Sequence, residues 1–112
     1  MGTKNRSGIL SVPEAAADLG LDKSIDTMHS EMRKVRYSGN SDADFALMMI
    51  PHHQGAIEMA KVELQFGADP RLRRLAQEII ITQQSEIEVM KDAIRNYPLS
   101  TPNLKRTNWC TR

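Results

Sequence analysis

The feature that most constrains the fold is a long segment, residues 41–66, that is predicted to be a single helix followed by a glycine. Ser41 is predicted to cap this helix. Asp42 and Asp44 lie in its first turn, where carboxylates suit the positive end of the helix dipole. Pro51 removes one backbone amide from the middle of the helix, so a bend is expected immediately before two adjacent histidines.

A second long helix is predicted downstream of this segment. Asp69 is a suitable cap and Pro70 falls in the first turn, where a missing amide costs little. The helix is predicted to continue to about Asn96 and to stop before Pro98.

Two further helices are predicted upstream. Residues 11–20 are expected to form a short helix, in which Ser11 and Glu14 make a capping box and Gly20 is the stop. A medium helix with one apolar face follows, and it is expected to end at Gly39.

The sequence therefore predicts an all-α fold, because no strand pattern is present in any part of the chain. Short connections make neighbouring helices antiparallel, so we expect an up-down bundle of one short and three longer helices over residues 11–97. Residues 1–10 are predicted to be a flexible leader and residues 98–112 an irregular tail. A bundle this thin could complete its core by forming a homodimer.

Composition argues against several classes of function. A formal net charge of +1 over 112 residues, with 4% aromatic residues, gives no basis for nucleic-acid binding. No apolar run is long enough to span a membrane, and no signal peptide is visible. The single Cys110 cannot form a disulfide within the chain. Methionine is the unusual component, with seven residues.

Methionine and histidine side chains are the candidates for chemistry. On a helical wheel of residues 41–66, His52, His53, Met49 and Met59 fall on one broad face. Thioethers are soft ligands and imidazole is intermediate, so the set suits copper, above all Cu(I). Protons compete for imidazole, so affinity should fall as the pH is lowered. Spacing alone supports a metal site and a hydrogen-bonded histidine pair in the core about equally.

The neighbouring predicted helices carry further candidates. Met28, His29 and Met32 lie on the upstream helix, and Met90 lies on the downstream one. They are interpreted as supporting thioether and imidazole ligands. Taken singly, a methionine on an apolar helical face is more often a residue that fills the core.

Polar residues interrupt the apolar stripe of the downstream helix at Gln83 and Glu86. Buried polar groups need partners, and a histidine on the facing helix is the expected one. Such a contact would fix the orientation of a histidine ring that binds a metal, or Glu86 could itself be a ligand. Asp42 is also included among the residues that could surround the ligands, although a role as first-turn partner of the helix dipole is the favoured interpretation.

The motifs resemble those of domain-of-unknown-function family 305. They are an Asp-x-x-Phe helix start at 42–45, Met-Ile-x-His-His-x-x-Ala-Ile-x-Met-Ala at 49–60, and Gln-x-x-Glu-Ile-x-x-Met at 83–90. The similarity covers about residues 25–97. It implies a ferritin-like helical bundle, often exported to the periplasm or secreted, with copper binding in some members.

The expected function is therefore non-enzymatic metal binding, most consistent with copper sequestration or transfer. The alternative is a structural or protein-interaction module in which the same histidines form a polar network without metal. An enzyme is the least favoured class. The chain has no His-Glu-x-x-His, no phosphate-binding loop and no nucleophile–base pair, and it lacks the Glu-x-x-His pairs of di-iron bundles.

Overall fold

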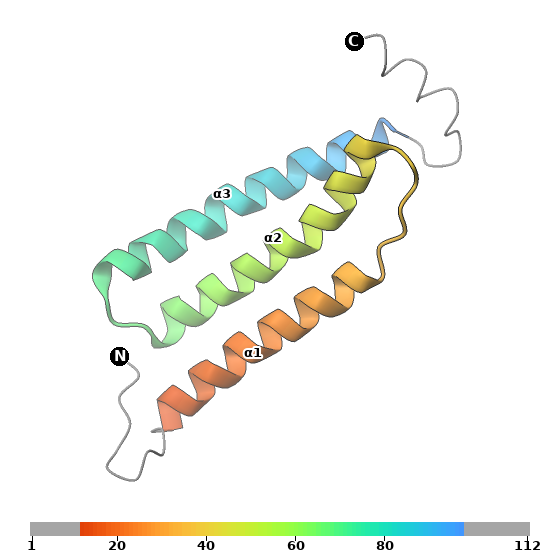
Figure 1. Cartoon of the computed structure of the whole chain (residues 1–112). Coiled ribbons are helices and arrows are strands. Elements are labelled where there is room, and N and C mark those ends of the chain that lie inside the picture. The colour runs from red at the N-terminus through yellow and green to blue at the C-terminus, as the bar shows by residue number, and fades with distance from the viewer. Residues whose placement is uncertain (1–11, 98–112) are drawn as a thin grey trace.

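Three helices form the part of the chain that the structure, a computed structural model, describes, residues 12–97 (Figure 1). They are α1 (Val12–Arg33), α2 (Ser41–Phe66) and α3 (Pro70–Arg95). Within this range there is no strand, which confirms the all-α prediction. The helices run antiparallel with α2 in the middle, and α1 and α3 make no backbone contact with each other. The predicted leader, residues 1–10, and the predicted tail, residues 98–112, lie outside the described residues.

The prediction of two separate upstream helices is wrong, because α1 continues through Gly20. A Cβ atom at Gly20 would lie 3.0 Å from a methyl carbon of Val62. Gly20 therefore serves close packing against α2 and does not act as a stop. The helix ends at Arg33, before Gly39, which lies in the connection with a φ of 87° that favours glycine. Ser11 of the expected capping box falls outside the described residues.

The connection between α1 and α2 is built from side-chain hydrogen bonds. Asn40, and not Ser41, is the cap of α2, and its side chain accepts a 2.9 Å bond from the amide of Ala43. The Asp44 carboxylate accepts bonds from the Ser38 amide at 2.7 Å and the Ser38 hydroxyl at 2.8 Å. These bonds, the Ser38 amide first, lower the pKa of Asp44 below its ordinary value.

The connection between α2 and α3 follows the prediction. Asp69 caps α3 by accepting bonds from the amides of Arg71 at 2.8 Å and Leu72 at 3.3 Å. Arg73 donates to the carbonyl oxygens of Leu64 at 2.7 Å and Gly67 at 3.1 Å. The carbonyls at the end of α2 are thus satisfied by a side chain from the start of α3.

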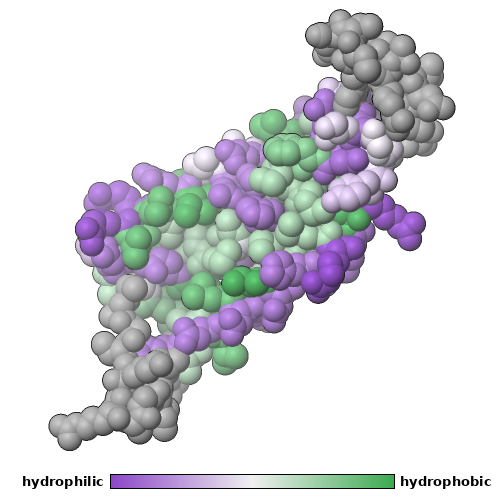
Figure 2. Space-filling model, in the orientation of Figure 1, coloured by the Kyte–Doolittle hydropathy of each residue, from purple (hydrophilic) through white to green (hydrophobic). Residues whose placement is uncertain are grey.

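The apolar core lies between α2 and α3. Its buried cluster consists of Ala46, Ile57, Ile87 and Met90. The contact between α1 and α2 is different, since Ser24 is the one buried residue of α1 among residues 14–33. Figure 2 shows green, apolar side chains along the middle of the molecule between purple, hydrophilic margins.

Candidate metal centre

His53 is the histidine that helix packing encloses. Its side chain is 12% exposed, and its Nε2 lies 2.6 Å from Oε1 of Glu86 on α3. A histidine contact was expected from the polar interruption of the α3 stripe, but the expected burial of Glu86 is wrong, because its side chain is 54% exposed. With Nε2–H donating to the carboxylate, the lone pair of the ring lies on Nδ1. That nitrogen is buried and has no hydrogen-bond partner among the described residues.

Thioethers accompany His53 in the contact between α2 and α3. Met49 precedes it by four residues, so the two side chains share one side of α2 one turn apart. Helical side chains lean toward the N-terminus, which takes the His53 ring toward Met49. Met49 packs against the core cluster that contains Met90 of α3. The contact between α2 and α3 thus contains Met49 and Met90 at the core cluster and His53 at its pair with Glu86.

A second group lies at the contact between α1 and α2. His29 and Met32 of α1 line an open cavity of about 390 Å³ together with Met48 of α2. The remaining lining residues are Arg33, Val35 and Tyr37. Met48 is absent from the ligands predicted from sequence. Its position four residues before His52 was the available signal.

The side chains of the two adjacent histidines lie on different sides of α2. His53 contacts α3, whereas His52 is exposed and follows Met48 by one turn. The two ring centroids are 6.1 Å apart and the rings are tilted by 56°. The pair therefore stands between the two methionine-containing groups.

The other predicted residues are not brought into these groups. Met28 packs against Gly55, where an added Cβ would lie 2.7 Å from its sulfur, and it lines a different groove. Met59 is half-buried two turns beyond His52, and Asp42 is exposed in the first turn of α2. Gln83 has a buried side-chain oxygen that has no partner within the described range.

Among residues 12–97, no group of three or more His, Cys, Asp or Glu side chains is placed to hold an ion. The usual ligand sets of zinc and non-haem iron are therefore not assembled in this region. The open cavity lined by His29, Met32 and Met48 instead brings together one imidazole and two thioether side chains.

The fold and these side chains define an all-helical protein with methionine and histidine at both contacts of its central helix. The chain belongs to the family described as a domain of unknown function (DUF305), which residues 14–94 match. It is also 43% identical over 53 residues to the uncharacterized protein L153 of Acanthamoeba polyphaga mimivirus. That match covers 47% of this chain and 35% of the viral protein.

None of α1, α2 and α3 is both long enough and apolar enough to span a bilayer.

Proposed function

We propose that the protein binds copper as Cu(I) and sequesters or transfers it without catalysing a reaction. One observation carries the proposal. The imidazole of His53 is oriented by Glu86, and its second nitrogen is buried without a partner among the described residues. Leaving such a nitrogen unsatisfied costs free energy, and a metal ion would remove that cost.

The two methionine-containing groups would provide one enclosed site and one open site for the ion. Met49, His53 and Met90 would hold the ion in the enclosed contact, with Glu86 behind the ring. His29, Met32 and Met48 would form the open group, where an ion can enter or leave. Exposed His52 follows Met48 by one turn and its ring lies 6.1 Å from that of His53, so it would pass the ion from one group to the other.

Titration of the metal-free protein with Cu(I) against a competing chelator tests this function. We expect tight binding that weakens in the His53→Ala variant and in Met49→Leu, which removes sulfur at nearly constant volume. Met28→Leu is the matched control, because it removes a thioether that packs against Gly55 outside both groups. Binding that is absent, or unchanged in a His52→Ala/His53→Ala double variant, would contradict the proposal.

A second function is supported by the same hydrogen bond. The His53–Glu86 contact already forms without metal, so the residues could be the polar network of a structural or interaction module. In that case the double histidine variant loses stability, while copper leaves the melting temperature unchanged. A ligand that binds the native state raises the melting temperature, so a copper-dependent rise decides against this function.

We also propose that the three helices belong to a ferritin-like bundle that a second copy completes. Support comes from the arrangement itself, in which α1 and α3 each pack on α2 alone. Four-helix bundles enclose a core from all sides, whereas these three described helices leave it open between α1 and α3.

A further inference from the structure

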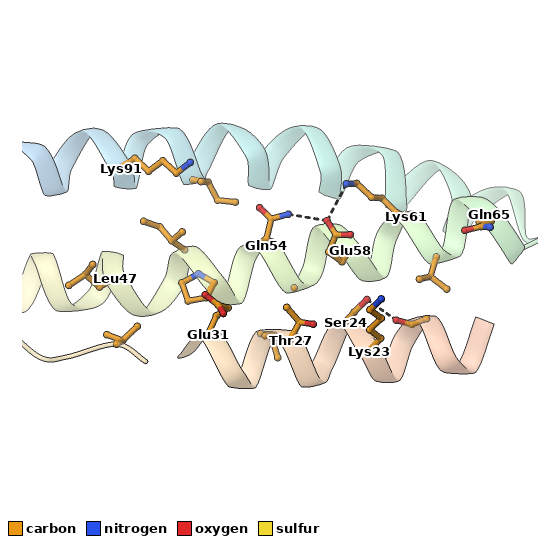
Figure 3. A pocket seen from close by; sticks show the side chains of 18 residues that line it. Lys23, Ser24, Thr27, Glu31, Leu47, Gln54, Glu58, Lys61, Gln65 and Lys91 are labelled. Atoms are coloured by element: carbon orange, nitrogen blue, oxygen red, sulfur yellow. Dashed lines mark hydrogen bonds and ion pairs between the residues drawn. The ribbon is translucent and has the colours of Figure 1, made fainter. Parts of the chain in front are cut away.

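A large groove runs along the face of α2 between α1 and α3, with a volume of about 830 Å³ (Figure 3). Apolar side chains from all three helices line it, among them Met28, Val62 and Ile87. The candidate ligands His29, Met32 and Met48 do not line this groove, and neither does His53, although Val35 lines both cavities. It is therefore separate from the candidate metal centre.

The helix beside the groove is the least supported one. α1 contacts α2 alone, and its one buried residue among 14–33 is Ser24, whose hydroxyl donates to the Gly20 carbonyl. An amphipathic helix is stable in water chiefly through the apolar face that it buries. A body of helical dimensions lying in the groove would cover both α1 and the uncovered edge of the core.

The charges at the groove have mixed sign. Lys23, Lys61 and Lys91 line it together with Glu31 and Glu58. Glu58 accepts bonds from Lys61 at 3.1 Å and from Gln54 at 3.0 Å, so the groove offers no concentrated field of one sign. Such a border does not select an anionic or a cationic small molecule.

The groove side of α1 has a self-complementary charge order. Lys23, Thr27 and Glu31 follow one another at intervals of four residues, and all three line the groove. When two identical helices pack antiparallel about a two-fold axis, a residue four before the axis faces the residue four after it. A two-fold axis at Thr27 would therefore place Lys23 of each copy opposite Glu31 of the other. The interface would contain two such opposite-charge pairs.

We propose that this groove is the interface of a two-fold homodimer in which the α1 helices of two copies pack antiparallel about Thr27. The inference deepens the proposed completion of the bundle, since it assigns the surface and its geometry. It does not depend on copper, because the candidate ligands of both groups lie outside the groove.

Charge exchange at Lys23 and Glu31 tests the pairing in sedimentation equilibrium of the full chain. Lys23→Glu and Glu31→Lys each turn both of these pairs into pairs of like charge. We therefore expect either variant to raise the dimer dissociation constant about tenfold. The double variant restores opposite charges and should restore the dimer. Asp22→Lys is the matched control, because Asp22 is an exposed neighbour of Lys23 on α1 that does not line the groove.

Disulfide trapping tests the position of the axis. In a Cys110→Ser background, Thr27→Cys should form a linked dimer under mild oxidation much faster than Asp26→Cys. Asp26 is exposed, and it does not line the groove. Rapid linkage at position 27 and charge rescue together support the two-fold arrangement.

Three results would overturn the inference. A chain that remains monomeric defeats both this interface and the proposed completion of the bundle. A dimer whose single charge variants are not rescued by the double variant defeats this interface alone. The third result is a dimer that dissociates in the Phe45→Asp variant but is unaffected by Lys23→Glu. Phe45 is 63% exposed and does not line the groove, so that result would place the interface on another surface.

Discussion

The two contacts of α2 are built in different ways. Toward α3, α2 contributes Ala46 and Ile57 to a cluster of buried apolar side chains. Toward α1, the fit depends on glycine, since Gly20 lies against Val62 and Gly55 against Met28. The first contact excludes water over a large apolar surface, while the second brings two backbones close together and buries little.

This difference indicates an unequal distribution of stability. The antiparallel pair of α2 and α3 should be the cooperative unit, while α1 should open at a lower free energy than global unfolding. The open group of candidate copper ligands, His29 and Met32 with Met48, spans the weaker contact. The enclosed group around His53 spans the stronger one.

The largest effect is expected for Ile87→Ala, in the strong contact. Ile87 is 1% exposed, and removing its side chain should cost about 2–5 kcal/mol in the free energy of unfolding. Ile25→Ala is the matched change in α1, at a half-buried position, and should cost less than half as much. Urea denaturation measures both values, and equal losses would contradict the proposed asymmetry.

Gly55→Ala should weaken the α1 contact selectively. Its new Cβ would come within 2.7 Å of the Met28 sulfur and 2.9 Å of the Met28 Cβ, so α1 has to move. We expect a loss of about 1–3 kcal/mol, as for other overpacked sites. Hydrogen exchange should show faster exchange in α1, while the amides of α2 and α3 far from Gly55 keep most of their protection.

Gly20→Ala provides the graded comparison for that experiment. The nearest atom to its new Cβ is a single Val62 methyl carbon at 3.0 Å, and alanine gains about 0.5–1 kcal/mol in helix propensity. The net change should therefore be smaller than for Gly55→Ala. The reverse order would mean that close approach at Gly55 is not what limits the fit of α1.

A smaller effect separates Asn40 from Ser41 at the start of α2. Asn40→Ala removes the side chain that accepts from the Ala43 amide, and should cost about 1 kcal/mol. Ser41→Ala removes an exposed side chain inside the helix, and should change the unfolding free energy by less than about 0.5 kcal/mol. Thermal unfolding of both variants decides which residue caps the helix.

The sequence predicted the local elements better than their roles in packing. Asp69 and Pro70 gave the start of α3 correctly, because a cap depends on neighbours within one turn. Gly20 was misassigned, since glycine marks both helix ends and close helix contacts, and only Val62 on another helix distinguishes them. Ser41 was predicted as the cap of α2, but the neighbouring Asn40, a residue type equally suited to capping, is the one that caps it.

The candidate site could be predicted only in part for the same physical reason. The polar interruption at Glu86 correctly pointed to a histidine on the facing helix, and the structure pairs it with His53. Periodicity alone could not divide the methionines between the two contacts of α2. Met28 and Met32 share a face on a wheel of α1, yet Met28 lies against Gly55 and Met32 lines the open cavity.

The smallest expected effect is the response to salt of the pKa values of Asp44 and Asp69, the aspartates at the two connections. Bonds from neutral donors, the Ser38 amide first, lower the pKa of Asp44, whereas the Arg71 side chain is the main cause of the lowered pKa of Asp69. Both stabilising contributions are complete above the ordinary pKa of 3.8 and are lost as the pH falls through the lowered values. Added salt should therefore raise the pKa of Asp69 and leave that of Asp44 nearly unchanged, because salt screens charge pairs. Carboxyl ¹³C NMR titrations at low and high salt measure both. Equal responses would mean that charge, and not the geometry of the α1–α2 connection, holds Asp44 ionised.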